Sequence, residues 1–419
     1  MRLRIHPAWI VAGITFATLF ATAGFRSAPS VLILPLEEDF GWRRDVISLA
    51  VAINVLLYGF TAPFAAALME RFTVRKVVMA ALFTVGTGAL LTIWMSQSWH
   101  LMLLWGVVVG VGTGSMALVF AATVANRWFV AKRGLVTGVL TAASATGQLI
   151  FLPGLSHLAS TYGWKSVSIT VSSFAILVVP FIFFFLRESP AEVGLLPYGA
   201  DSDWQPPAKS ELSAGALAID TLKQSAKKKD FWFLYGSFFV CGLSTSGLIG
   251  THFIPAAHDH GMPTTLAASL LAMVGIFDVI GTIFSGWLTD RYDPRKLLFF
   301  YFGTRGLSLF LLPSILFSEI HASTLVFVIF YGLDWVATVP PTIMLCRSIL
   351  GPERASIVYG WVFTGHQIGG AIAAFGAAIL RVKLGDYAVA FYISGAMCII
   401  TAYFVLQIAK GVDDKVLRT

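Results

Sequence analysis

The chain has 419 residues, of which 57% are hydrophobic and 12% are charged, against roughly 25% charged residues in typical soluble domains. Such a composition excludes an ordinary soluble protein, because the polar side chains cannot cover a water-facing surface. The formal net charge of +7 does not indicate a nucleic-acid partner, because the basic residues lie in the connections between apolar segments.

Apolar runs of about 20 residues, long enough to cross a bilayer, recur along the whole chain. Charged or Pro/Gly-rich breaks separate twelve of them, which predicts an all-α membrane protein. In the first half they cover residues 8–35, 46–68, 77–96, 100–126, 134–158 and 165–186. In the second half they cover residues 231–256, 264–289, 297–318, 322–346, 355–380 and 387–409.

The basic residues predict how the chain crosses the membrane. Most of the 29 Lys and Arg residues lie at the two termini and in the even-numbered connections. By the positive-inside rule, both termini face the cytoplasm, and so does the polar stretch between the halves. We therefore expect a multi-pass protein of a bacterial-type inner membrane, with an N-terminal six-helix bundle in 1–186, a cytoplasmic linker in 187–230 and a C-terminal bundle in 231–419.

The two halves repeat one another at an offset of 220 residues. Pro35, Asp39 and Gly41 recur as Pro255, Asp259 and Gly261, and residues 70–76 recur as residues 290–296. Two tandem copies of one multi-helix unit are typical of membrane carriers. Small-residue patterns at 106, 110 and 114 and at 365 and 369 predict close contacts between helices.

One loop carries a family resemblance. The stretch Gly286–Lys296 resembles the G-x-L-x-D-R-x-G-R-R/K loop between the second and third helices of each half in the major facilitator superfamily. The first copy, residues 66–76, is degraded, with Ala66 in place of the usual Gly and Glu70 in place of Asp. The resemblance implies twelve transmembrane helices in two six-helix bundles related by a pseudo-two-fold axis, working by alternating access.

A narrower resemblance concerns the substrate. The end of the first apolar run, Pro35–Trp42, is similar to that of the monocarboxylate-porter and oxalate/formate-antiporter branch, and Gly275–Asp278 is similar to the Gly-Phe-x-Asp of monocarboxylate porters. Those porters place an Arg four residues after this Asp to hold the substrate carboxylate, and here Thr282 stands at that position. The resemblance implies monocarboxylate transport, and the departure leaves the carboxylate ligand open.

The repeated charged loops are candidate gates. Each places an acidic residue at the end of one helix before basic residues at the start of the next, which can bridge to the neighbouring bundle when the cytoplasmic side is closed. The alternative is that they are charged turns with side chains that reach to the membrane surface. The candidate gating residues are Glu70, Arg71, Arg75, Asp290, Arg291 and Arg295.

Three charges fall deep inside predicted helices. At 1.5 Å per residue, Asp278, Arg305 and Asp334 lie about 18, 14 and 20 Å from the cytoplasmic ends, near the midplane where carriers bind substrate. We expect them to serve proton coupling, with Asp278 as the proton carrier. Alternatively the charges neutralise one another, with Arg305 as a buried partner of Asp334 or Asp278.

Other polar residues of the predicted helices are candidates for contact with substrate. Arg26 is an isolated cation in the first helix, and a guanidinium group can hold a carboxylate through paired hydrogen bonds. The full substrate-binding set is Arg26, Asn54, Tyr58, Gln148, His366 and Gln367. The alternative for the neutral members is hydrogen bonding between helices.

These features predict a secondary active transporter of small organic anions, coupled to protons and acting as a monomer in the lipid bilayer. The alternatives are an anion exchanger or an exporter of another small metabolite, and least of all a membrane enzyme or sensor. No nucleophile–base pattern, phosphate-binding loop or metal-ligand spacing is evident, so we expect no enzymatic activity, no cofactor, no metal and no nucleic-acid partner.

Overall fold

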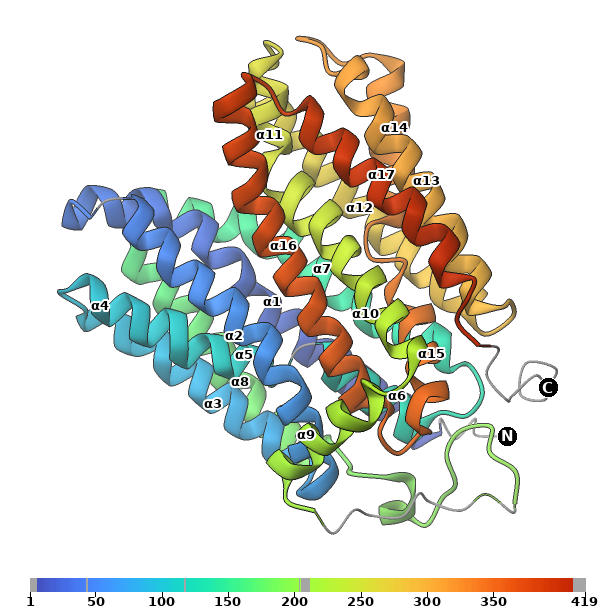
Figure 1. Ribbon diagram of the computed structural model, residues 1–419. Coiled ribbons are helices and arrows are strands. Elements are labelled where there is room, and N and C mark those ends of the chain that lie inside the picture. Colours follow the sequence, from blue (N-terminus) through green and yellow to red (C-terminus); the bar gives the residue numbers. More distant parts are fainter. Residues whose placement is uncertain (1–5, 43, 117, 203, 205–211, 410–419) are drawn as a thin grey trace, which may run out of the picture. The chain divides into compact units, whose positions relative to one another are not determined.

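The helices of this chain gather into two compact units, Met1–Thr221 and Leu222–Thr419 (Figure 1). The computed structural model describes residues 6–42, 44–116, 118–202, 204 and 212–409, although the side chains of some residues in these ranges lie outside the description. Within the described residues the regular elements are helical, and the single contact of strand type is an isolated bridge between Phe129 and Tyr198. The predicted all-α architecture is confirmed.

The described residues of the first unit form six long helical segments, some of them built from consecutive helices. They are α1 (Pro7–Phe40); α2 (Arg44–Arg71); α3 (Val74–Leu91) with η1 (Thr92–Trp94); α4 (Ser98–Leu101) with η2 (Met102–Val109), α5 (Gly110–Gly114) and α6 (Leu118–Trp128); α7 (Arg133–Tyr162); and α8 (Trp164–Phe185). The predicted linker contains the short turn η3 (Pro190–Val193) and the helix α9 (Ala214–Ser225).

The second unit repeats this order. Its segments are α10 (Lys229–Gly242) with η4 (Leu243–Ile249) and α11 (Gly250–Asp259); α12 (Thr264–Thr289); α13 (Pro294–Ile315); α14 (Ala322–Asp334) with α15 (Val339–Leu350); α16 (Ala355–Leu384); and α17 (Ala388–Val405). Eleven stretches of the described residues are long and apolar enough to cross a membrane, so the protein is a multi-pass membrane protein.

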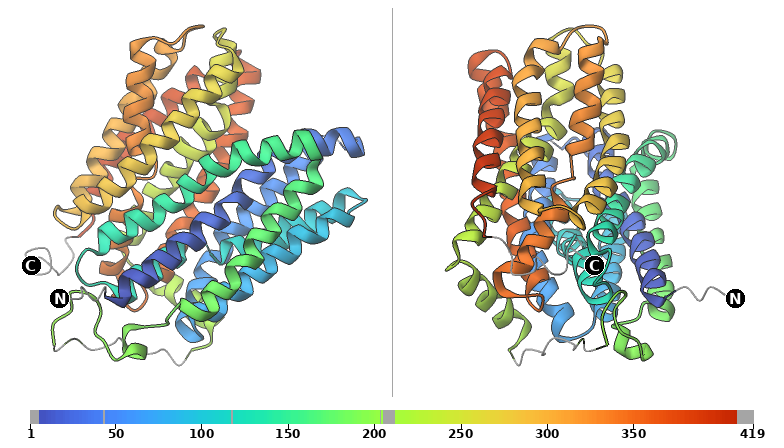
Figure 2. Two further views of the ribbon diagram at one scale, coloured as in Figure 1. Left: turned by 180° about the vertical axis from the view of Figure 1, so that it is seen from behind. Right: turned by 90° about the vertical axis from the view of Figure 1, so that its right-hand side faces the viewer.

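Each unit builds its core from the same pairs of segments (Figure 2). The first segment packs on the fifth, as α1 on α7 and α10 on α16, and the third packs on the sixth, as α3 on α8 and α13 on α17. The second packs on the fourth, as α2 on η2 and α5 in one unit and α12 on α14 in the other. The repeat in the sequence is therefore also a repeat in helix packing.

Glycine permits the closest of these approaches. A Cβ atom at Gly369 of α16 would overlap the carbonyl oxygen of Phe239 in α10, and a Cβ atom at Gly242 would overlap that of His366. In the first unit, a Cβ atom at Gly114 would lie 2.7 Å from the carbonyl oxygen of Tyr58. The close helix contacts predicted from the small-residue patterns are confirmed.

The fourth segment of each unit is interrupted at the same place in the repeat. In the first unit α5 ends at Gly114, and in the second α14 ends at Asp334, which lies 220 residues further on. The continuous apolar runs 100–126 and 322–346 do not reveal these interruptions. Pro340 and Pro341, at the start of α15, give the physical reason in the second unit, because proline has no backbone N–H group to bond to the preceding turn.

Candidate functional site

Buried polar side chains meet inside the second unit, where α14 is interrupted. They are Cys241 of α10, Asp278 of α12, Arg305 of α13, Asp334 at the end of α14 and Thr338 in the interruption, and we call them the central cluster. Each of the three charged residues is at most 4% exposed. Charges are costly within a membrane-spanning bundle, so this cluster is the leading candidate for a functional site.

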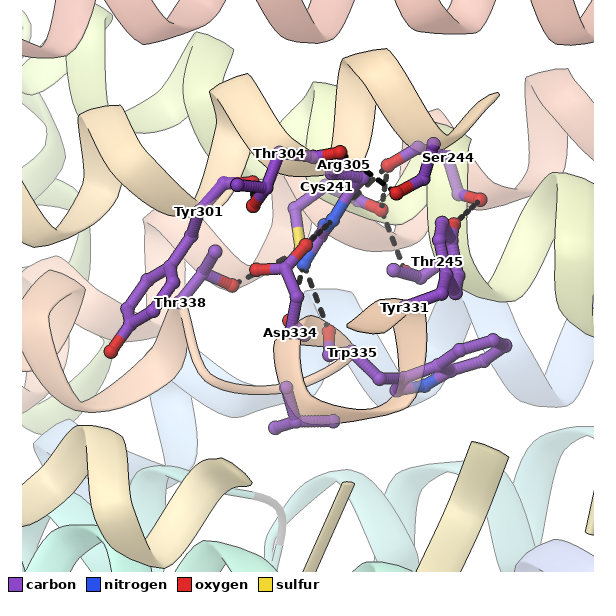
Figure 3. Close-up of polar contacts among 12 residues, drawn as sticks. Cys241, Ser244, Thr245, Tyr301, Thr304, Arg305, Tyr331, Asp334, Trp335 and Thr338 are labelled. Carbon is purple, nitrogen blue, oxygen red and sulfur yellow. Dashed lines mark hydrogen bonds and ion pairs between the residues drawn. The ribbon is translucent and has the colours of Figure 1, made fainter. Parts of the chain in front are cut away.

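Arg305 uses all its donors inside the second unit (Figure 3). Its Nε donates to Oδ2 of Asp334 at 2.6 Å, while Nη1 donates to Sγ of Cys241 at 3.1 Å and to Oγ of Ser244 at 3.5 Å. Its Nη2 donates to the main-chain carbonyl oxygens of Asp334 at 2.6 Å and Trp335 at 3.2 Å. A guanidinium group has five N–H donors, so this conformation leaves none for a substrate.

Asp334 is the acidic partner of Arg305, and one of its oxygens remains unused. The distance between Nε of Arg305 and Oδ2 of Asp334 marks a buried ion pair. Among the described residues, no partner reaches the buried Oδ1 atom of Asp334. Nearby, Sγ of Cys241 lies 3.3 Å from Oγ1 of Thr338, which extends the polar contacts from α10 to the interruption.

Asp278 is held by neutral donors. Its Oδ1 accepts hydrogen bonds from Oγ1 of Thr282 and from the main-chain N–H of Val336, each at 2.9 Å. Thr282, which stands where the monocarboxylate porters have Arg, therefore contacts the carboxyl group itself. Because the charge of Arg305 is already balanced by Asp334, the cluster contains one carboxyl group more than its cation requires.

His366 and Gln367 belong to α16, next to the central cluster. The ring of His366 lies 5.6 Å from that of Phe238 and 5.7 Å from that of Phe363, measured between centroids. Its Nδ1 atom is buried and has no partner among the described residues, and the Gln367 side chain is also buried. The backbone of His366 lies against Gly242, which follows Cys241 in α10.

The first unit holds the remaining predicted substrate residues. Nδ2 of Asn54 donates to the carbonyl oxygen of Trp105 at 2.8 Å, a bond between helices of the same unit. Tyr58 is buried against Gly114, at the repeat position of Asp278. Arg26 and Gln148 lie in α1 and α7, and their side chains are outside the described residues.

Glu70 takes part in a charge cluster at one end of the first unit. Nη2 of Arg127 donates to Oε2 of Glu70 at 3.0 Å and to the carbonyl oxygen of Met69 at 2.8 Å. Nη1 of Arg127 pairs with Oε1 of Glu188, whose Oε2 accepts from the main-chain N–H of Val74 at 2.7 Å. Glu188 thus joins the start of α3 to the end of α6.

Sequence reasoning missed Glu188, which it assigned to the beginning of a surface linker. The signal that could have identified it is the cation Arg127, which recurs as Arg347 at the end of the fourth segment of the second unit. Burial raises the pKa of the Glu188 carboxyl group above its ordinary value, and the charge of Arg127 opposes this shift only in part.

The other predicted gating residues also make contacts within their own units. In the first unit, Nη1 of Arg71 donates to the carbonyl oxygen of Leu212 at 2.6 Å. Nη1 of Arg75 donates to the carbonyl oxygen of Phe183, at a longer 3.4 Å. These bonds anchor the first charged loop to the linker and to α8.

The second charged loop follows a similar pattern. Arg291 lies over the ring of Trp287, 4.0 Å from its centroid, and Asp290 is the C-cap residue that follows α12. Arg295 forms two hydrogen bonds with Asp293, at 3.0 and 2.6 Å, and donates to the carbonyl oxygen of Ile408 at 2.8 Å. Hydrogen bonds from Arg295 lower the pKa of Asp293, although its partial burial acts in the opposite direction.

Comparison with protein families matches most of the chain to a family model. The family model described as Major Facilitator Superfamily matches residues 14–374.

Among the described residues, no group of three or more His, Cys, Asp or Glu side chains is arranged to hold a metal ion.

Curated relatives are similar at low identity over nearly the whole chain. An uncharacterised transporter of this type, YcxA from Bacillus subtilis, is 25% identical over 90% of this chain and 88% of its own. Monocarboxylate transporter 11 from Homo sapiens is 24% identical over 97% of this chain and 84% of its own. Both matches therefore extend over most of this chain and most of the relative.

Solved structures are similar in fold. The fucose:proton symporter FucP from Escherichia coli has a TM-score of 0.72 at 16% identity and covers 97% of this chain and 100% of its own. A structure of XylE has a TM-score of 0.73 at 14% identity and covers 98% of both chains. At such identity the likeness concerns the fold alone.

Proposed function

Because the chain belongs to the Major Facilitator Superfamily, we propose that it is a proton-coupled secondary transporter of small organic anions, with monocarboxylates as the substrate class. Alternating access moves the substrate across the membrane, and no bond of the substrate is made or broken. The similarity to monocarboxylate transporter 11 supports the substrate class, and the buried carboxyl group of Asp278 supports the coupling.

The carboxyl group of Asp278 is the observation that carries this proposal. It is 2% exposed, while the only cation of the central cluster, Arg305, is already paired with Asp334. A buried carboxyl group beyond the charge balance can exist in two protonation states without breaking an ion pair. Asp278 is therefore the proton carrier in this proposal, and Arg305 and Asp334 form the fixed pair beside it.

The substrate ligands remain those proposed from the sequence. His366 is the best placed of them in the second unit, because its buried Nδ1 lacks a partner among the described residues and can meet a substrate oxygen. Gln367 accompanies it. In the first unit Arg26 supplies the cation for a carboxylate, on the strength of its residue type and position in α1, and Asn54, Tyr58 and Gln148 complete the lining.

The proposal also covers the oligomeric state of the protein, its membrane and its orientation there. The protein acts as a monomer in a bacterial-type inner membrane, with both termini in the cytoplasm, as the distribution of Lys and Arg supports. The YcxA similarity supports a bacterial-type membrane. The charged residues at 70–75 and 290–295 act as gates at the cytoplasmic side.

The test uses the purified protein in liposomes with an inward proton gradient and a panel of radiolabelled monocarboxylates, neutral sugars and lipophilic cations. Gradient-driven accumulation of a monocarboxylate is the expected result. Asp278→Asn should abolish accumulation while leaving exchange of substrate across the membrane intact, and Asp386→Asn, at an exposed loop position, serves as the control. Accumulation of sugars or cations alone would overturn the substrate class, and accumulation by Asp278→Asn would remove Asp278 as the proton carrier.

A further inference from the structure

The interruption between α14 and α15 leaves backbone groups without the hydrogen-bond partners that a continuous helix would provide. In a membrane each buried backbone group without a partner is costly, so such groups need a substitute. Four of them find one in side chains of neighbouring helices. Arg305 donates to the carbonyl oxygens of Asp334 and Trp335, Ser285 donates to that of Ala337 at 2.5 Å, and Asp278 accepts from the N–H of Val336.

These side-chain caps differ in one respect that matters for function. Ser285 carries no charge, and Arg305 is protonated under all ordinary conditions. Asp278 alone among the three can change its charge by taking up a proton. An ionised carboxylate accepts an N–H bond more strongly than a neutral carboxyl group does, so protonation weakens the contact with Val336.

The groups around Asp278 leave its contact with Val336 sensitive to a change in the charge of the carboxyl group. Thr282 faces it from its own helix, and Val336 faces it from the interruption. The charged or titratable groups that act on it electrostatically are Arg305 from α13 and Cys241 from α10, and Asp334 at the end of α14 is coupled to it in turn. Arg305 and Asp334 form an ion pair with each other, and the hydrogen bonds to Asp278 come from Thr282 and Val336.

We propose that Asp278 is a positioning residue as well as the proton carrier: its carboxylate holds the main-chain N–H of Val336, and protonation releases residues 335–338. The proton thereby acts directly on the joint between α14 and α15. This inference rests on the proposed function, because it assigns to the coupled proton the structural element that it controls.

The first unit provides an internal comparison. Its fourth segment is interrupted at the equivalent position, but Tyr58 and Gly114 stand where the second unit has Asp278 and Asp334. The contact there is between a glycine and the backbone of Tyr58, and neither position carries a carboxyl group. Proton control is therefore expected in the second unit's interruption alone.

Hydrogen–deuterium exchange of the full-length protein in lipid nanodiscs, followed by mass spectrometry, tests the inference. Peptides that cover residues 335–339 are compared at about pH 5 and about pH 8 after correction for the intrinsic pH dependence of exchange. In the wild type, the corrected exchange rate should be about tenfold faster at the lower pH, as expected for the weakening of a charge-assisted hydrogen bond.

Variants separate Asp278 from its neighbours. Asp278→Asn keeps an oxygen acceptor but cannot ionise, so the corrected rate should no longer depend on pH. Thr282→Val removes the other donor to the same oxygen and should retain the pH dependence. If Asp278→Asn does not fold, Asp278→Glu replaces it: displacement of the carboxyl group by one methylene should lower protection at the higher pH and flatten the pH profile.

A pH-independent rate in the wild type, or an unchanged pH dependence in Asp278→Asn, would overturn the inference. The experiment needs no substrate, so it stands apart from the transport assay. Proton-driven anion uptake together with a hydrogen–deuterium exchange rate that does not depend on pH would overturn this inference alone. A pH-dependent exchange rate at residues 335–339 without any anion transport would overturn the proposed substrate class and leave this inference standing.

Discussion

Arg305 binds Asp334 at two points, through its carboxylate and through its main-chain carbonyl oxygen, each at 2.6 Å. The first contact balances the charge of the carboxylate, and the second satisfies a carbonyl group at the end of α14. One side chain therefore provides both the ion pair and the helix cap, so its loss should affect stability in two separable ways.

Replacing Arg305 with Met should lower the free energy of unfolding by about 3–5 kcal/mol, because the carboxylate of Asp334 is left buried without its cation. The double variant Arg305→Met with Asp334→Leu should recover part of this loss, since the stranded charge is gone, but the uncapped carbonyl groups remain. Thermal denaturation of the purified proteins in detergent measures both. A double variant no more stable than the single one would contradict the ion-pair explanation.

Substitution of Gly369 by Ala should destabilise the second unit by about 1–3 kcal/mol, because the new methyl group would overlap the carbonyl oxygen of Phe239 in α10. The matched control is Gly376→Ala in the same helix, where nothing lies within 4 Å of the added atom. Melting temperatures of the two variants and the wild type provide the comparison. Equal losses for both variants would mean that helix packing is not the cause.

The pH dependence of stability should reveal the buried carboxyl group of Glu188. Because its pKa is raised in the folded protein, its ionisation opposes folding, so this contribution is favourable below the unfolded pKa and is lost as the pH rises through the folded pKa. The melting temperature of the wild type should therefore fall relative to Glu188→Gln from about pH 4 upward and then level off. A relative rise would show that the attraction of Arg127 outweighs burial.

Tyr198 should hold the beginning of the linker on the first unit. Its N–H donates to the carbonyl oxygen of Trp128 at 2.8 Å, and its ring lies 5.6 Å from Trp9 and 5.9 Å from Phe129. Tyr198→Ala should make residues 187–204 more sensitive to limited proteolysis, because these ring contacts disappear. Tyr162→Ala, at an exposed position, should leave the cleavage pattern unchanged, and equal sensitivity in both variants would contradict the proposed anchor.

The membrane segments could be predicted from the sequence because their signal is local. Runs of apolar residues locate helices in lipid, and the offset of 220 residues follows from comparing one half with the other. The recurrence of Gly41 as Gly261 has a direct structural meaning, since both adopt positive φ angles, of 66° and 84°, just after a helix end. Such positions favour glycine, so the repeat preserved the residue with the backbone conformation.

The contacts of the central cluster could be predicted only in part. The depth of Arg305 and Asp334 in their helices made a pair plausible, but the sequence offered Asp278 as an equal partner. The capping of Val336 by Asp278 depends on the interruption of α14, and the apolar run conceals that interruption. Cys241 was assigned no role because a lone cysteine inside a helix has no signal, and its contact with Arg305 arises from helix packing.

The interruption shared by the two units has a consequence for how this transporter can be redesigned. The first unit, with Tyr58 and Gly114, shows that the joint can be built from uncharged residues. In the proposed function, proton coupling is therefore a property of the second unit that the uncharged equivalent in the first unit lacks. A chain whose second unit carries the uncharged version should equilibrate its substrate down a gradient and lose the capacity to concentrate it.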